Sequence, residues 1–232
     1  MSAYSDLILA ESGLVSYWRL GEASGTSAAD AKGVNTGTYT GTPTLGATGA
    51  LTGSGDNNTA MGPLNGTSQY INVADNASLH VNDVFTLEAW VSRGATGAKR
   101  IIMGAANGQP FLSISATGYL ILEIGLTTVA TSTAAVGTGW HHIVATKNGT
   151  ARYLYIDDAD VTSTGTNATC TTPTGRFTIG AGYWGGYGSW TNATLDEVAF
   201  YNTALSAASV LAHYTAGTTL SGFPHSQAVV IA

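Results

Sequence analysis

The chain has 232 residues, of which 44% are hydrophobic and only 9% are charged, whereas an ordinary soluble domain carries about 25% charged residues. Eight Lys and Arg against fourteen Asp and Glu give a net charge of −6. This balance excludes a nucleic-acid-binding surface, which needs clustered basic residues to neutralise phosphates. No apolar run reaches the roughly 20 residues that span a bilayer, so no membrane insertion is expected.

The N-terminal quarter is rich in turn residues and poor in strong strand signals. Residues 1–13 are expected to form an apolar lead-in, followed by a first strand over 14–20. Residues 21–62 contain only scattered apolar residues, which is unusual for so long a segment of a compact domain. Short strands at 36–40 and 60–64, with ligand-held loops between them, are therefore expected.

The middle of the chain carries the clearest β signals. In 85–91 the apolar residues fall on every second position, the period of a strand with one buried face. Residues 140–156 predict a hairpin whose tight turn is centred on Asn148-Gly149, because both residues tolerate the positive φ that such a turn needs. Further strands are expected at 69–73, 100–104, 111–115, 119–125, 127–131, 160–163, 177–180 and 194–201.

The C-terminal part contains the only predicted helix, over 206–217, with Ser206 as its N-cap and Gly217 as its end. The last segment, 218–232, is expected to be an arm that adds an edge strand or pairs with a neighbouring subunit. The domain proper is therefore predicted over 14–217. Cys170 is the single cysteine, so no disulfide forms within the chain, and its polar, threonine-rich surroundings favour a structural role.

Several stretches, taken together, resemble one family. Residues 15–22, 65–73, 78–79, 85–91, 140–144, 153–157, 179–180, 195–202 and 204–206 follow, in order, the pattern of laminin-G-like domains, in the pentraxin-related branch found in bacterial and phage surface proteins. The resemblance implies an all-β fold: a two-sheet antiparallel jelly-roll sandwich of the concanavalin A-like type, with one short C-terminal helix. Asp157-Asp158 departs from the usual Asp-Gly, so this turn is expected to differ.

Catalytic chemistry is not expected. Retaining glycosidases place two carboxylates about 5 Å apart, yet Glu88 has no acidic neighbour on its predicted strand. Asp196 and Glu197 are adjacent, so a regular strand would point them to opposite faces. His141 and His142 should diverge for the same reason, and they lack metal-ligand spacing with the other histidines.

The resemblance implies a calcium ion on the convex side of the sandwich, held by backbone carbonyls and one carboxylate. The matching positions are Asp30, Gly33 and Asp196, and hard oxygen ligands of this kind suit Ca²⁺. Such an ion would tie down the weakly structured 21–62 segment. The alternative is that Asp30 is a turn residue and Asp196 a hydrogen-bond acceptor at the end of a strand.

A glycine-rich loop carries four aromatic residues in nine positions, at 182–190. Exposed aromatic rings can stack on sugars, and nearby amides supply the polar contacts that pocket recognition adds. The predicted ligand-binding residues are Tyr183, Trp184, Tyr187, Trp190 and Asn192. The alternative is that one or two of these rings cap the end of the sandwich.

On the family resemblance we expect a non-catalytic decoration or adhesion protein on the surface of a phage virion, on its capsid or tail. Its partners would be other virion or surface proteins and cell-surface glycans, and its C-terminal arm would support a homo-oligomer. The start at Met1 and the lack of a secretory signal favour an independently made structural component. The alternative is a carbohydrate-binding module of a bacterial extracellular protein.

Overall fold

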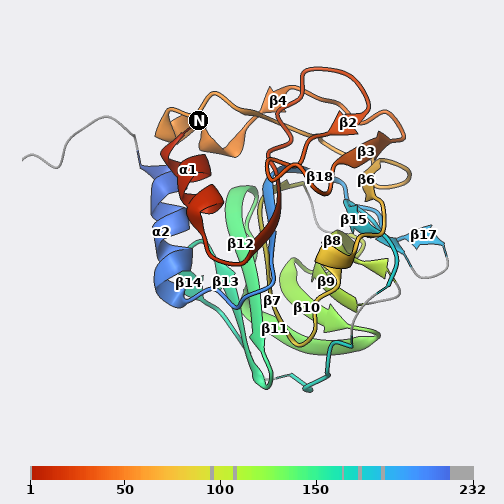
Figure 1. The fold of residues 1–232 in the computed structure, drawn as a ribbon, viewed down its shortest axis with the longest axis vertical. Helices are drawn as coiled ribbons and strands as arrows, with labels where there is room; N and C mark the ends of the chain where they lie inside the picture. Colours follow the sequence, from red (N-terminus) through yellow and green to blue (C-terminus); the bar gives the residue numbers. More distant parts are fainter. Residues whose placement is uncertain are drawn as a thin grey trace, which may run out of the picture.

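A computed structural model describes residues 2–94, 97–106, 109–163, 165–171, 174–183 and 186–219. Within these residues two large antiparallel sheets face each other, with the loops of the N-terminal quarter at one end (Figure 1). The predicted all-β jelly-roll sandwich is confirmed.

The six-stranded sheet contains the predicted central strand and hairpin. Its longest strands are adjacent, and ten residue pairs join β7 to β12. In spatial order its members are β1 (Leu14–Trp18), β18 (Ala193–Tyr201), β7 (Val84–Arg93), β12 (Gly139–Asn148), β13 (Ala151–Ile156) and β14 (Ala159–Asp160).

The eight-stranded sheet forms the opposite layer. In spatial order its members are β11 (Thr127–Ala135), β10 (Tyr119–Ile124), β9 (Gln109–Ile114), β8 (Arg100–Ala105), β15 (Phe177–Ile179), β6 (Tyr70–Val73), β3 (Gly37–Thr40) and β2 (Ser27–Ala28). Two small hairpins and two 3₁₀ turns complete the strand layers: β4 (Ala47–Thr48) with β5 (Thr59–Ala60), β16 (Gly182–Tyr183) with β17 (Tyr187–Gly188), η1 (Ala50–Ser54) and η2 (Ala77–Leu79).

The core between the sheets follows the alternation predicted for residues 85–91. Phe85, Leu87, Ala89 and Val91 are buried in one large cluster with residues of the opposite sheet. Trp90, on the other face of β7, belongs to a second cluster. The strand therefore buries both of its faces, one against the second sheet and one under the helices.

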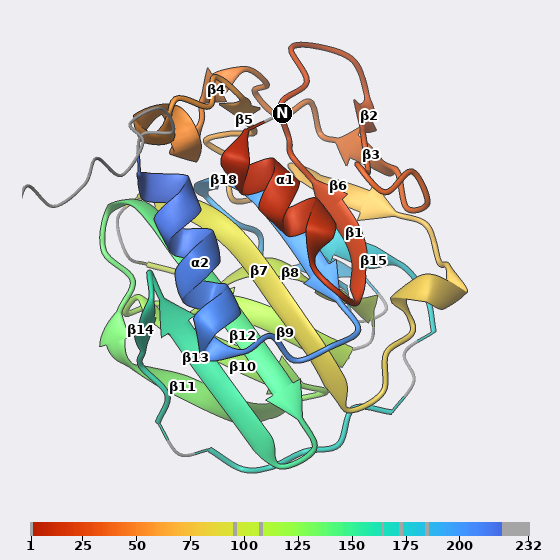
Figure 2. The ribbon, with the colours of Figure 1, turned by 60° about the vertical axis from the view of Figure 1, so that its left-hand side comes forward.

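Two helices cover the outer face of the six-stranded sheet (Figure 2). The predicted one is α2 (Ala207–Thr218), capped by the Ser206 side chain, which accepts a hydrogen bond from the Ser209 N–H. The other, α1 (Ala3–Ala10), corrects the expectation of an N-terminal lead-in and of a single helix. Its sequence signal is weak because it has only eight residues and its capping box is formed by two serines, Ser2 and Ser5, where Glu or Gln is usual at the second position.

The tight turn of the 139–156 hairpin lies one residue further along than predicted. Asn148 pairs with Ala151 as the last residue of β12, so Gly149 and Thr150 are the central residues. Gly149 has φ +61°, whereas Asn148 and Thr150 do not have a positive φ. A positive φ at the first central residue only is the pattern of a type II′ turn.

The segment 21–62 contains four short strands and one 3₁₀ turn, but the expected strand at 60–64 is limited to β5. Protein side chains hold the segment in place. Glu22 accepts hydrogen bonds from the Tyr39 hydroxyl at 2.6 Å and the Ala29 N–H at 2.7 Å. The Asn58 amide donates to the Arg19 carbonyl and to Glu197. These contacts connect the segment to the end of β1 and to β18 and order parts of it.

Candidate functional site

A groove at the outer face of the eight-stranded sheet combines charge, an aromatic ring and amide groups. It encloses a volume of about 380 Å³ and is lined by Asn72, Ala74, Asp75, Ala106, Gly175, Arg176 and Tyr183. The residues come from β6, from the segment that enters β15, from the end of β8 and from β16. We call it the Arg176 groove.

The register of β6 and β15 explains why these polar side chains meet. Phe177 pairs with Val73, and both point into the core. Since successive side chains of a strand alternate between faces, Asn72 and Arg176 both face outward. Asn72 pairs with Thr178, so Arg176 lies diagonally across from it. The Arg176 Nη1 donates to the Asn72 Oδ1 at 3.2 Å.

The Arg176 side chain is also positioned by an aromatic ring. Its guanidinium carbon lies 4.7 Å from the centre of the Tyr183 ring, which is the distance of a cation–π contact. Arg176 and Tyr183 are both half-buried. A planar guanidinium held between a ring and an amide loses less conformational freedom when it binds a ligand than one on a free side chain does.

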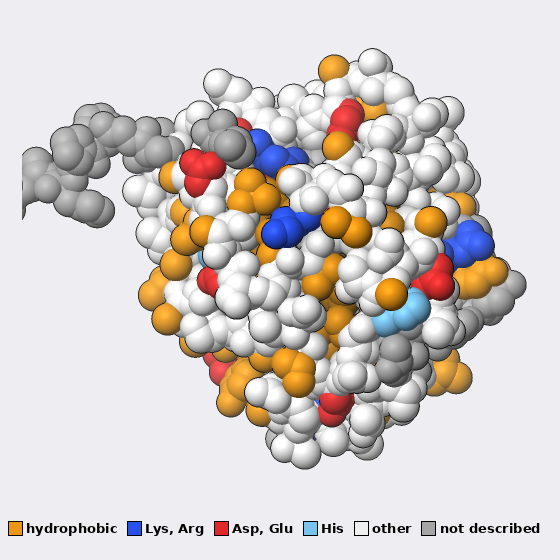
Figure 3. All heavy atoms as spheres, in the orientation of Figure 1, with side chains coloured by type: hydrophobic (Ala, Val, Ile, Leu, Met, Phe, Trp, Pro, Cys, Tyr) orange, Lys and Arg blue, Asp and Glu red, His pale blue; other side chains and the backbone are white. Residues whose placement is uncertain are grey.

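Asp75 supplies the acidic group of the groove. Its Oδ1 lies 2.6 Å from the His80 Nε2 and accepts the Gly175 N–H at 2.8 Å. The His80 hydrogen bond, with that of Gly175, lowers the pKa of Asp75 below its ordinary value. The groove thus contains a cation, an ionised carboxylate and an amide within one concave surface. In Figure 3 the face is mostly neutral, and basic, acidic and histidine surfaces adjoin one another at the right-hand rim.

The five predicted ligand-binding residues are only partly brought together. Tyr183 lies in the Arg176 groove. Trp184 and the side chain of Tyr187 lie outside the described residues. Trp190 is half-buried and packs edge-on against Tyr70, with ring centres 5.3 Å apart. Exposed Asn192 accepts a hydrogen bond from the Arg100 Nε.

Sequence reasoning did not find Asn72, Asp75 and Arg176. The alternation within the predicted strand 69–73 is a signal that could have placed Asn72 on the outer face, and Arg176 comes directly before the strand predicted over 177–180. Only the strand register, which joins segments about a hundred positions apart in the chain, shows that these residues line one groove with Tyr183.

The residues predicted to hold calcium are separated. Asp196 lies on β18, which pairs with one edge of β1. The Asp30 backbone pairs with Trp18 on the opposite edge of β1. The Asp30 carboxylate accepts the backbone N–H groups of Tyr17, Lys32, Val34 and Asn35 at 2.8 to 3.2 Å. These four donors match the roughly four lone-pair sites of a carboxylate. The arrangement does not fit a single ion shared by Asp30, Gly33 and Asp196, and the calcium site remains a prediction from the family resemblance.

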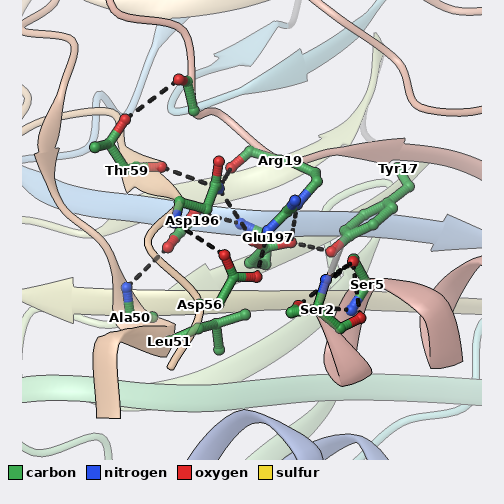
Figure 4. Close-up of polar contacts among 12 residues, drawn as sticks. Ser2, Ser5, Tyr17, Arg19, Ala50, Leu51, Asp56, Thr59, Asp196 and Glu197 are labelled. Atoms are coloured by element: carbon green, nitrogen blue, oxygen red, sulfur yellow. Dashed lines mark hydrogen bonds and ion pairs between the residues drawn. The ribbon is translucent and has the colours of Figure 1, made fainter. Parts of the chain in front are cut away.

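Asp196 and Glu197 join one buried network, contrary to the expectation that a regular strand would separate them (Figure 4). The register of β18 against β7 shifts between Asp196 and Ala199, and Glu197 has φ +49°. This bulge re-aims the side chains, as bulges commonly do. Asp196 accepts hydrogen bonds from the backbone N–H groups of Ala50 and Glu197 at 2.8 and 3.0 Å.

Glu197 is the centre of the same network. Its carboxylate accepts hydrogen bonds from the Tyr17 hydroxyl and, at 2.9 Å, from the Arg19 Nη2, which also contacts Asp56 at 2.5 Å. Burial, together with the neighbouring Glu197 charge, raises the pKa of Asp196 well above its ordinary value. Burial also raises the pKa of Glu197. The guanidinium provides the positive charge that two buried acids require.

Glu88 forms a second buried network, under the two helices. The His142 Nε2 lies 2.7 Å and the His213 Nδ1 3.0 Å from its Oε1, and the Tyr201 hydroxyl donates to its Oε2 at 2.7 Å. The Tyr4 hydroxyl donates to Oε1 at 3.2 Å. Glu88, Asp196 and Glu197 are all 0% exposed. None of these three carboxylates is accessible to a substrate.

Within the described residues, three or more His, Cys, Asp or Glu side chains do not gather as ligands for one metal ion. Neither α1 nor α2 has the length and apolar character of a membrane-spanning helix.

The two facing antiparallel sheets are those of a concanavalin A-like jelly-roll sandwich. The chain belongs to the Laminin_G_3 family of the concanavalin A-like lectin/glucanases superfamily, whose sequence profile matches residues 65–211. No curated protein shows significant sequence similarity to the chain.

Solved structures share the fold at low sequence identity. Domain 4 of AbnA, a GH43 extracellular arabinanase from Geobacillus stearothermophilus determined in complex with arabinotriose, superposes with a TM-score of 0.66 at 20% identity, over 88% of this chain and 99% of that domain. Trypanosoma rangeli sialidase, in complex with 2,3-difluorosialic acid, gives 0.64 at 17% identity, over 87% of this chain and 32% of the sialidase.

Botulinum neurotoxin type C, described as depending on two ganglioside molecules for cell entry, gives a TM-score of 0.66 at 9% identity, over 93% of this chain and 53% of the toxin chain. The chain thus spans about a third of the sialidase and half of the toxin chain. At these identities the likeness shows a common fold.

Proposed function

We propose that the protein is a non-catalytic carbohydrate-binding module that holds glycans in the Arg176 groove. The observation that carries this proposal is the Tyr183–Arg176–Asn72 arrangement, in which a ring, a guanidinium and an amide line one concave surface. Sugars present hydroxyls and apolar ring faces, which such a mixture of groups recognises.

The structural neighbours support the same class of ligand. The arabinanase domain was determined with arabinotriose, and the toxin depends on gangliosides. Because the arabinanase domain is matched over almost its whole length, a module attached to or acting beside an extracellular enzyme is the better supported setting. An extracellular or surface location follows from that setting.

A binding role without catalysis is consistent with the placement of the acids. Glu88, Asp196 and Glu197 are inaccessible, and Asp75, the acid that lines the groove, accepts hydrogen bonds from His80 and Gly175. A hydrolase would need a second carboxylate facing Asp75 across a bound sugar. The groove lining contains no other Asp or Glu among the described residues.

The virion assignment remains a prediction from the family resemblance, as do the partner proteins and the homo-oligomer. None of the three neighbours described above is a virion protein. Stable co-purification with particles, or a symmetric oligomer in solution, would support the virion assignment.

The proposal is tested with a glycan array followed by titration calorimetry on the glycan that binds best. Tyr183→Ala and Asn72→Ala should each weaken binding about tenfold, since each removes one contact worth 1–2 kcal/mol. Tyr153→Ala is the matched control, because Tyr153 is 45% exposed on β13 of the other sheet. Equal binding by all four proteins would exclude this groove.

A further inference from the structure

We infer that the Arg176 groove selects acidic sugars, in which a carboxylate binds the Arg176 guanidinium while ring hydroxyls bind Asp75 and Asn72. This inference rests on the proposed function and names the class of ligand for the same site. Glycans that contain uronic or sialic acid residues have this combination of carboxylate and hydroxyls.

The first support is the choice of cation. A guanidinium matches the planar geometry of a carboxylate and can bind it through two parallel hydrogen bonds. Arg176 is held in place on one face by the Tyr183 ring and at its Nη1 by Asn72, 3.2 Å away. A sugar carboxylate that competes with the neutral Asn72 amide for this guanidinium replaces a neutral acceptor with a charged one, and charge-assisted hydrogen bonds are roughly twice as strong.

The second support is the setting of this cation in an acidic protein. With a net charge of −6, the whole molecule repels anions at long range, so an anion binds where a local cation outweighs that field. Arg176 places such a cation inside a groove, where its Nη1 donates to the Asn72 amide oxygen.

The third support is that the acid of the groove is already engaged. The Asp75 Oδ1 accepts from His80 and from the Gly175 N–H, and Gly175 directly precedes Arg176. These bonds, with the adjacent guanidinium, offset the repulsion that Asp75 would exert on a second carboxylate. Asp75 then serves as the acceptor for a sugar hydroxyl, so the groove recognises a carboxylate and a hydroxyl of the same sugar.

The test uses glycans that end in glucuronic, galacturonic or N-acetylneuraminic acid, each paired with its methyl ester. The ester keeps every hydroxyl and removes only the charge. The wild-type protein should bind at least one acid about tenfold more tightly than its ester, a ratio that should fall as salt is added. Arg176→Gln should abolish this ratio, and Arg176→Lys should restore only part of it, because Lys lacks the planar fork.

Lys32→Gln is the control, since it removes the same charge from an exposed position outside the groove. Acid and ester binding equally well, or Lys32→Gln lowering the ratio as much as Arg176→Gln, would overturn the inference. If neutral sugars bind and the binding depends on Tyr183, the proposed function stands while the acidic preference fails. If neither acids, esters nor neutral sugars bind, the proposed function fails as well. Melting curves of the variants confirm that each is folded.

Discussion

Glu88 shows how one side chain can fix both helices to a sheet. It lies on the outward face of β7. Its carboxylate accepts hydrogen bonds from the hydroxyls of Tyr4 on α1 and Tyr201 on β18, and from the Nδ1 of His213 on α2. Burial alone would raise the pKa of Glu88, but the His213 charge and the hydrogen bonds from His142 and His213 hold the pKa far below the ordinary value. An ionised, fully paired carboxylate is therefore the native state of this buried site.

Glu88→Gln should lower the free energy of unfolding by about 3 kcal/mol, because it leaves buried partners without the charge they surround. The loss should depend on pH. Burial, the largest single effect, lowers the pKa of His213, but the charges and hydrogen bonds of Glu88 and Glu11 together raise it above its ordinary value. A raised histidine pKa contributes stability that is fully present below the unfolded value and is lost as pH rises through the folded value. Urea unfolding from about pH 5.5 to 9 measures both effects.

The difference between wild type and Glu88→Gln should thus be largest near pH 5.5 and shrink as the pH rises through the raised, folded-state pKa of His213. The titrations of Asp196 and Glu197 cancel in this difference, because both proteins retain that network. A difference that stays constant across the range would show that His213 does not sense the Glu88 charge. Asp158→Asn, at an exposed position, controls for the loss of one acidic charge.

At the scale of single residues, sequence patterns predicted which face of a strand a side chain occupies better than they predicted which residues it contacts. The period of two placed Phe85 in the core and Glu88 on the opposite face, as found. It also placed Asp196 and Glu197 on opposite faces, which is wrong because a bulge interrupts β18. A bulge is set by pairing with neighbouring strands, and a positive φ at Glu197 leaves no sequence signal.

At the scale of elements, the hairpin of β12 and β13 was predicted but its turn was misplaced by one residue. Asn-Gly predicts a type I′ turn with positive φ at both residues, whereas Asn148 pairs with Ala151. The Lys147 ammonium adds a constraint that sequence does not show: it is fully buried, forms an ion pair with Asp83 at 2.5 Å and donates to the Gly149 carbonyl. The Lys147–Asp83 ion pair is thus found together with the register in which Asn148 pairs with Ala151.

The two turn residues should therefore respond differently to substitution. Gly149→Ala should lower the free energy of unfolding by about 1 kcal/mol, since a side chain at φ +61° is strained by about that amount. Asn148→Ala should change stability by less than about 0.5 kcal/mol, because Asn148 is an exposed strand residue. Urea unfolding of both variants checks the contrast. Equal losses would support the type I′ turn that the sequence predicted.

The helix α1 was missed for an energetic reason. Eight residues are too few for a stable helix in isolation, so packing decides whether the segment becomes helical. Tyr4 and Ile8 are fully buried, and Tyr4 packs edge-on against Trp90 at 6.2 Å between ring centres. Trp90 lies 86 residues from Tyr4 in the sequence, which is why local propensity did not indicate the helix.

At the scale of the whole molecule, the sandwich could be predicted because its strands repeat a local signal many times. The candidate site could not, because the Arg176 groove joins 72–75 to 175–183 through strand pairing and a small hairpin. The aromatic loop gave the right neighbourhood, since Tyr183 lines the groove. The charged residues of the groove, Asp75 and Arg176, lie just outside strands, where no periodic sequence pattern marks them.

The calcium prediction also belongs to this scale, because an ion at Asp30 and Asp196 would join the 21–62 segment to the six-stranded sheet. Such an ion would make EDTA lower the Tm, and Asp196→Asn would remove that effect. The hydrogen bonds of the two carboxylates favour the other result, in which EDTA leaves the Tm unchanged. Asp30→Ala should then lower the free energy of unfolding by about 3 kcal/mol with or without Ca²⁺, because four backbone N–H donors lose their acceptor. Scanning calorimetry of wild type and both variants, in EDTA and in Ca²⁺, separates an ion-held segment from one held by its own backbone.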